Sequence, residues 1–145
     1  MPSHIPEGFH TVTPYLVVPG VARLIDFLRE AFGAEELGRY AAPDGRIMHA
    51  LVRIGDAMVE MGEPSEQWGP MPGNLHLYVE DADAVYARAL QAGATSLSEP
   101  DLKPYGDREA GVRDPSGNNW FIATRQEQVS PEEFERRTAA AQQPA

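Results

Sequence analysis

The sequence predicts an α+β fold in which two βαβββ modules form a cupped mixed sheet with helices on its outer face. The main observation is an internal repeat of about 60 residues, a length typical of one supersecondary unit used twice. Residues 13–18 read Thr-Pro-Tyr-Leu-Val-Val, and residues 74–79 read Asn-Leu-His-Leu-Tyr-Val. A helical stretch follows each segment and ends on a related tag, at 31–34 and at 91–94. The two halves should build one cavity, and that cavity is where function is sought.

Composition limits the class of protein. The chain has 145 residues, no cysteine and a formal net charge of −10. It is long enough to bury a core, and it has neither disulfides nor thiolate chemistry. The acidic charge argues against nucleic acid and anionic membrane surfaces as partners. We expect a cytoplasmic protein, because neither a signal peptide nor an apolar stretch of the ~20 residues that span a bilayer is visible.

A leader at 1–11 precedes the first module, 12–62. The alternation of 12–18 predicts a strand, and the apolar stripe of 21–32 predicts a helix that stops at Gly33. The remaining strands are expected at 37–40, 47–54 and 57–61, joined by turns at Pro43-Asp44-Gly45 and Gly55-Asp56.

The segment 63–73 holds three Pro and two Gly, so it is predicted to be a linker. The second module, 74–125, repeats the order of the first. A strand at 75–79 precedes a helix at 81–92, with Asp81 or Asp83 near its N-cap. After this helix we expect a short extended piece at 96–98, a loop at 99–107, and a hairpin of strands 109–113 and 119–124 across Pro115–Gly117.

The tail at 126–145 is expected to carry a short C-terminal helix. Ser130 suits an N-cap, Pro131 suits the first helical position, and Glu132 and Glu133 suit the first turn. The final Ala, Gln and Pro residues should fray.

The first strand of each module has one apolar face, which should take the helix of that module. This face comprises Leu16, Val18, Leu75, Leu77 and Val79. The opposite face comprises Thr13, Tyr15, Asn74, His76 and Tyr78. Polar and aromatic groups on a sheet face indicate the lining of a cup.

Several phrases of this sequence resemble the vicinal oxygen chelate superfamily (glyoxalase, bleomycin resistance and dioxygenase proteins), and most closely its PhnB-like branch. They are Thr13-Pro-Tyr-Leu-Val-Val, Ala31-Phe-Gly-Ala-Glu-Glu, Asp44-Gly-Arg-Ile-Met-His-Ala, Ile54-Gly-Asp, His76-Leu-Tyr-Val-Glu-Asp, Tyr105-Gly-Asp-Arg, Arg113-Asp-Pro-Ser-Gly and Trp120-Phe-Ile-Ala-Thr. The likeness covers about residues 12–137. It implies the fold and a homodimer whose pocket takes residues from one or both subunits, but it implies no one activity, because this fold hosts many chemistries.

Metal-dependent members of that superfamily place ligands at four points, which match Thr13, Glu60, Asn74 and Phe121 here. Only Glu60 is a competent ligand for a transition metal, because Phe121 has no donor atom and the other two are weak neutral donors. We therefore expect no cofactor and no metal at the usual position of the superfamily.

Two histidines and one carboxylate are the candidate catalytic residues. His76 shares a strand face with Asn74, and Glu60 should project into the cup. There the Glu60 carboxylate can orient the His76 ring, so that His76 acts as a general base. His49 should face the cup as well, so that His49, Glu60 and His76 form the metal site if one exists. The alternative is that His76 is a hydrogen-bonded histidine of the pocket wall.

Other residues are candidates for ligand binding. The inward-facing set is Tyr15, Met58, Tyr78 and Phe121, which either line an aromatic pocket or form core between the modules. Arg53 and Arg113 either clamp a carboxylate or phosphate or pair with surface acids. Trp68, Tyr105 and Arg108 lie in long loops and form either a rim or exposed decoration.

Three functions remain open from the sequence. The first is a binding or resistance-type protein that holds a small organic ligand in the cup. The second is a metal-independent isomerase, lyase or cyclase that uses His76 or His49 with Glu60. The third is a metal-dependent glyoxalase-like or dioxygenase-like enzyme with a relocated site.

Overall fold

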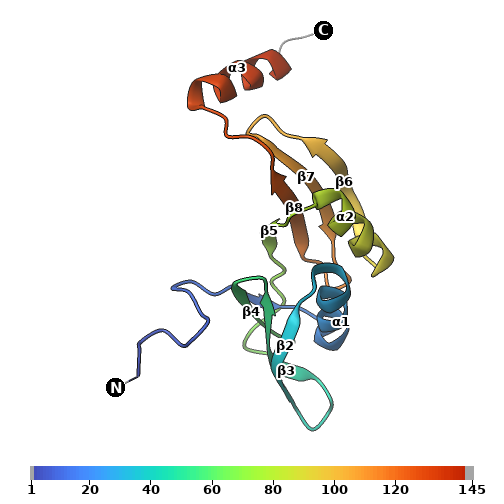
Figure 1. Cartoon of the computed structure of the whole chain (residues 1–145). Coiled ribbons are helices and arrows are strands. Elements are labelled where there is room, and N and C mark those ends of the chain that lie inside the picture. The colour runs from blue at the N-terminus through green and yellow to red at the C-terminus, as the bar shows by residue number, and fades with distance from the viewer. Residues whose placement is uncertain (1, 143–145) are drawn as a thin grey trace.

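The computed structural model describes residues 2–142 and contains two βαβββ modules followed by a C-terminal helix (Figure 1). It confirms the predicted α+β fold class. The first module comprises β1 (Tyr15–Val17), α1 (Val21–Phe32), β2 (Glu35–Ala41), β3 (Ile47–Ile54) and β4 (Ala57–Gly62). The second module comprises β5 (Asn74–Tyr78), α2 (Ala82–Gln91), β6 (Thr95–Leu102), β7 (Asp107–Arg113) and β8 (Asn119–Arg125), and the last helix is α3 (Pro131–Gln142).

Each module contributes one four-stranded mixed sheet. The strand orders are β1-β4-β3-β2 and β5-β8-β7-β6, and only the β1–β4 and β5–β8 pairs are parallel. In the first sheet Glu60 pairs with Tyr15 on one side and Leu51 on the other. In the second sheet Phe121 pairs in the same way with His76 and Gly111. The repeat in the sequence is therefore a repeat of strand register as well.

Helix α1 begins and ends where its sequence predicts. Its apolar residues recur at helical spacing, and the stripe is buried against the first sheet: Val21, Leu24, Ile25, Phe27, Leu28 and Ala31. Gly33 ends the helix with a φ of 67°, a left-handed conformation that glycine adopts without a Cβ penalty. Its N–H donates to the carbonyl oxygen of Arg29 at 3.1 Å.

Helix α2 has Asp81 as its N-cap, which decides between the two acids that the sequence proposes. The Asp81 carboxylate accepts a hydrogen bond from the Ala84 N–H at 3.1 Å, which satisfies one of the unpaired N–H groups of the first turn. Asp83 instead forms a bidentate pair with Arg108 of β7, at 2.7 and 2.9 Å.

Strand β6 is longer than its sequence predicts, because it continues to Leu102 through Pro100. The predicted loop at 99–107 is therefore wrong in its first half. Proline is compatible with this strand because β6 lies at the edge of its sheet, where one side of the strand needs no ladder hydrogen bonds. The pairing with β7 is irregular here, with register shifts on both sides of Ser98.

The two modules share one hydrophobic core. Helices α1 and α2 lie side by side (Figure 1), and the Phe32 ring of α1 packs at a tilt against Trp120 of β8, with 5.0 Å between ring centroids. The Ser116 hydroxyl, in the turn between β7 and β8, also donates to the Pro19 carbonyl oxygen at 2.7 Å. Both helices cover one face of the sheets, which leaves the opposite faces free of helix. Within residues 2–142, no helix combines the length and the apolar character needed to cross a membrane.

Candidate functional site

The helix-free face of the first sheet places one histidine beside one carboxylate. His49 of β3 and Glu60 of β4 form a hydrogen-bonded pair with 2.9 Å between Nε2 and Oε1. Both project from the same face because the strands alternate with period 2. The Tyr15 ring of β1 lies 6.0 Å from the imidazole ring. Burial first and the charge of Glu60 second raise the pKa of the Tyr15 phenol, so it remains protonated as a hydrogen-bond donor.

An apolar cavity of about 450 Å³ lies beside this pair. Its walls are Tyr15, Val17, Met48, Gly62, Glu63, Ser65 and Trp68. Trp68 comes from the linker, and 65% of its surface is exposed although it lines the cavity. Gly62 allows β3 and β4 to approach closely at this wall, because a Cβ there would lie 2.4 Å from the Met48 carbonyl oxygen. The linker therefore contributes one aromatic side chain, Trp68, to the cavity wall.

The helix-free face of the second sheet places its histidine beside a different carboxylate. His76 of β5 pairs with Glu109 of β7, at 2.8 Å between Nε2 and Oε1. The Tyr105 hydroxyl donates to the same Glu109 oxygen at 2.8 Å. Burial and then this hydrogen bond raise the pKa of Tyr105. Glu109 corresponds by register to His49 of the first module, so the repeat has kept the position and changed the residue.

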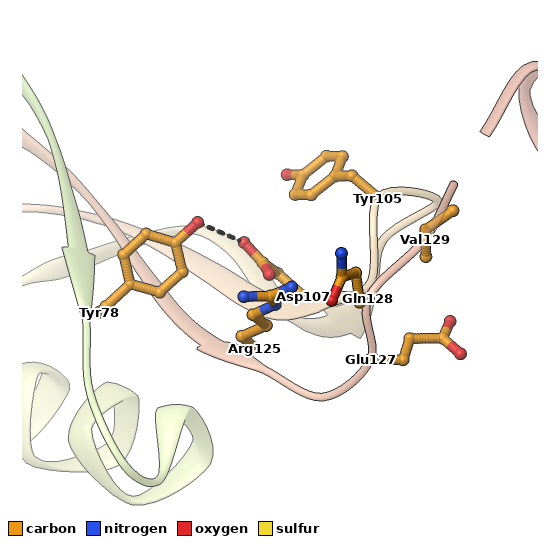
Figure 2. A pocket seen from close by; sticks show the side chains of 7 residues that line it. All are labelled: Tyr78, Tyr105, Asp107, Arg125, Glu127, Gln128 and Val129. Carbon is orange, nitrogen blue, oxygen red and sulfur yellow. Dashed lines mark hydrogen bonds between the residues drawn. The ribbon is translucent and has the colours of Figure 1, made fainter. Parts of the chain in front are cut away.

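A second carboxylate, Asp107, lies next to this group. The Tyr78 hydroxyl donates to Asp107 Oδ2 at 2.9 Å, and the Asp107 residue is only 4% exposed. This hydrogen bond is the main reason why the pKa of the Tyr78 phenol is raised. Figure 2 shows both side chains at a cavity of about 700 Å³, whose walls are Tyr78, Tyr105, Asp107, Arg125, Glu127, Gln128 and Val129.

The structure therefore brings His49 and Glu60 together and places His76 with Glu109 in the other module. Sequence reasoning missed Glu109 and Asp107. The two-residue period of a strand could have found them. Counting back from Arg113 in steps of two reaches Glu109 and Asp107, which lie on the same face of the sheet as His76. The predicted strand begins at Glu109 and so omits Asp107, and the register that brings β7 near His76 runs through β8.

The remaining candidate residues lie in four kinds of surroundings. Arg53 pairs with Glu35, and Arg113 donates to the Asn119 side chain at 2.9 Å, so both are engaged by neighbours on their own sheets. Arg108 lies on the helix-covered side, where it pairs with Asp83 of α2. Met58 is buried, and the leader passes over it: a Cβ on Gly8 would lie 2.8 Å from the Met58 methyl carbon. Phe121 is half-buried beside His76.

The donor set at the four positions that match the metal ligands of the superfamily does not fit a transition metal. Phe121 has a hydrocarbon side chain, and the Asn74 oxygen accepts a hydrogen bond from Asn119 at 2.8 Å. Glu60 is the only carboxylate among the four, and His49 is its partner. One carboxylate with neutral oxygens falls short of the several imidazole and carboxylate donors that such ions need.

Comparison with curated proteins finds uncharacterized relatives of similar length. Mb0911c of Mycobacterium bovis is 36% identical over 135 residues, which cover 86% of this chain and 89% of that protein. Rv0887c of Mycobacterium tuberculosis is 36% identical over 135 residues, covering 86% of this chain and 79% of the relative.

Solved structures share the fold. TioX from Micromonospora sp. ML1 superposes with a TM-score of 0.66 at 26% identity, covering 83% of this chain and 100% of its own. TnmS3, an antibiotic binding protein from Streptomyces sp. CB03234, has a TM-score of 0.63 at 24% identity, covering 81% of this chain and 96% of its own. Lactoylglutathione lyase from Agrobacterium tumefaciens has a TM-score of 0.61 at 19% identity, covering 82% and 94%.

The family comparison covers most of both modules. The model of the Glyoxalase/Bleomycin resistance protein/Dioxygenase superfamily matches residues 8–122, which include all eight strands except the last part of β8. The chain therefore belongs to the glyoxalase/bleomycin resistance protein/dioxygenase superfamily.

Proposed function

We propose that this protein binds a small organic ligand against the helix-free faces of its sheets, without a metal at the four positions used by metal-dependent members. The observation that carries this proposal is a set of aromatic side chains left exposed around two cavities. Tyr15 and Trp68 border one of them, and Tyr78 and Tyr105 border the other. Between 44% and 65% of each residue is exposed, so each has aromatic surface that a flat ligand would bury.

The ligand pocket is proposed to close in a homodimer. In the single chain the His49–Glu60 face and the His76–Glu109 face are both open, with half-exposed imidazole groups. A second copy that brings two such faces together would enclose the cavities and supply residues from both subunits. Light scattering coupled to size exclusion tests this part: a dimer mass supports it, and a monomer mass over micromolar to millimolar concentrations contradicts it.

One comparison supports a binding function. TnmS3, which is an antibiotic binding protein, shares this fold, so the fold is compatible with binding alone. The sequence phrases of both modules, taken together, favour a place in the PhnB-like branch. This branch assignment is a proposal from those phrases and names no ligand.

A fluorescence titration with 1-anilinonaphthalene-8-sulfonate, a flat aromatic probe, tests the binding proposal. We expect saturable binding that Trp68→Ala weakens about tenfold, which corresponds to about 1.4 kcal/mol, because the probe loses one aromatic wall. The matched control is Phe134→Ala, since Phe134 is an exposed aromatic residue on α3 and borders neither cavity. Absence of saturable binding, or an equal effect of both variants, would contradict the proposal.

A metal-independent enzyme is the second candidate function. Its support is that two His–Glu pairs, at 2.9 and 2.8 Å, open onto helix-free faces, which is the arrangement of an oriented general base. Such a base exchanges an acidic carbon-bound proton with solvent. Deuterium incorporation into a bound organic ligand in D₂O, lost in His76→Ala or His49→Ala, would favour an enzyme over a binding protein.

A further inference from the structure

One cluster in the second module has a chemistry that ligand binding does not account for. His76 comes from β5, and Asp107 and Glu109 come from alternate positions of β7. Each offers one ligand atom, and the three atoms all lie within 4.8 Å of one another. An imidazole nitrogen and two carboxylate oxygens at such separations can surround a single ion.

Within residues 2–142, the two carboxylates of this cluster form no ion pair with Arg or Lys. Asp107 is 4% exposed, and the Glu109 side chain is 12% exposed. Arg125 of β8 lies across from Asp107 in the β7–β8 ladder and borders the same cavity (Figure 2), but it forms no ion pair with Asp107. Two neighbouring carboxylates with little solvent repel each other, so the cluster favours a bound cation.

The hydrogen bond within the cluster is one that a metal ion can replace. His76 Nε2 and Glu109 Oε1 are 2.8 Å apart because the imidazole N–H donates to the carboxylate. When a metal ion binds, this proton leaves and both atoms become available as ligands. The imidazole nitrogen also favours a transition ion over Mg²⁺ or Ca²⁺, which prefer oxygen ligands only.

Two phenols hold the carboxylates in place. Tyr78 donates to Asp107 at 2.9 Å, and Tyr105 donates to Glu109 at 2.8 Å. Hydrogen bonds of this kind orient the ligands of metal sites. We propose that His76, Asp107 and Glu109 bind one divalent first-row transition metal ion. This site differs from the four positions of the superfamily and from the predicted His49, Glu60 and His76 set.

The test is titration of the full-length protein, stripped with EDTA, with Mn²⁺ followed by electron paramagnetic resonance and with Zn²⁺ followed by calorimetry. We expect one ion per chain for at least one of the two metals. His76→Asn and Glu109→Gln should each weaken that binding by at least about tenfold. The matched controls are His49→Asn and Glu60→Gln, which remove the same residue types from the His–Glu pair of the first module and should leave binding unchanged.

The outcomes separate this site from its alternatives. No binding of either ion, or binding that His76→Asn and Glu109→Gln leave unchanged, would overturn the proposal. Loss of binding in His49→Asn would also overturn it and move the ion to the first module. Circular dichroism of each variant checks that the fold is intact, and Glu109→Gln keeps the shape of the side chain if His76→Asn unfolds. The proposal does not rest on organic ligand binding, because the fluorescence titration can fail while metal binding is retained.

Discussion

At the scale of single residues, the surroundings of a side chain decide its chemistry. Tyr105 lies in the loop before β7, where burial and the hydrogen bond to Glu109 raise its pKa. The pKa of the Tyr78 phenol is raised as well, chiefly by its hydrogen bond to Asp107. Both phenols are therefore donors to carboxylates across the range in which the acids are ionised. Two short side-chain contacts thus define the second-module cluster.

The raised pKa of Tyr105 has a consequence for stability at high pH. The folded protein holds this proton above pH 10.0, the ordinary value, where the unfolded chain releases it. Its stabilising contribution is therefore complete below that pH and is lost as the pH rises towards the folded pKa. We expect the free energy of unfolding in urea to fall less steeply above pH 10 in Tyr105→Phe than in the wild type. Tyr40→Phe, at an exposed phenol, is the control, and equal slopes for both variants would contradict the assignment.

At the scale of elements, the turn between β7 and β8 is held by one buried carboxylate. Asp114 accepts hydrogen bonds from the N–H groups of Ser116 and Asn118, from the Asn118 amide and from the Trp120 indole, at 2.8–3.0 Å. The Asn118 oxygen in turn accepts from the Gly73 N–H at 2.9 Å. The phrase Arg113-Asp-Pro-Ser-Gly therefore ties the linker to the second sheet.

Removal of this carboxylate should be costly. Asp114→Ala leaves four donors without their partner in a buried turn, so we expect a loss of about 3 kcal/mol in the free energy of unfolding. Asp44→Ala is the control, because Asp44 lies in an exposed turn and pairs only with Arg46. Asp44→Ala should lower the free energy of unfolding by no more than about 0.5 kcal/mol. Similar losses in urea denaturation of the two variants would be evidence against this role of Asp114.

The end of α1 offers a second test at this scale. Gly33→Ala places a Cβ on a residue with a φ of 67°, where nothing within 4 Å obstructs it, so only the backbone conformation is penalised. We expect a loss of about 1 kcal/mol by thermal or urea unfolding. Gly38→Ala, in the exposed edge strand β2 with equally open space, should cause no loss. A neutral Gly33→Ala would show that the left-handed cap contributes nothing.

At the scale of the whole molecule, the modules are coupled through shared packing. Phe32 of α1 contacts Phe27 at 5.6 Å within its own helix and Trp120 of the other module at 5.0 Å between ring centroids. One continuous core runs through both halves. The modules should therefore unfold together rather than in sequence.

Phe32→Ala tests this coupling. The variant should lose about 2–3 kcal/mol of its free energy of unfolding, because the substitution leaves a hole in the core between the modules. It should still unfold in a single transition. Tryptophan fluorescence and far-ultraviolet circular dichroism should report the same urea midpoint. Phe134→Ala is the control, since α3 has no buried residues, and it should change stability by less than about 0.5 kcal/mol. Two separate midpoints in the wild type would show that the modules fold independently.

The local part of the fold was predictable from the sequence. The bounds of α1 follow from apolar spacing and from the glycine after it, and the hairpin of β3 and β4 follows from Gly55-Asp56 between two strand-like runs. The inward faces of β1 and β5 follow from the two-residue period of a strand. These features depend on neighbours within a few residues, so the sequence contains the information directly.

The partners of the inward-facing residues were decided only by the tertiary structure. Which carboxylate meets which histidine depends on strand order and register between segments far apart in the chain, so His76 meets Glu109 and His49 meets Glu60. The same long-range pairing turns Arg108 towards Asp83 and lets β6 continue through Pro100 at a sheet edge. The sequence by itself determined the modules, their helices and the faces that carry chemistry. The tertiary structure decided how that chemistry is combined, because contacts across a sheet are set by register and not by local pattern.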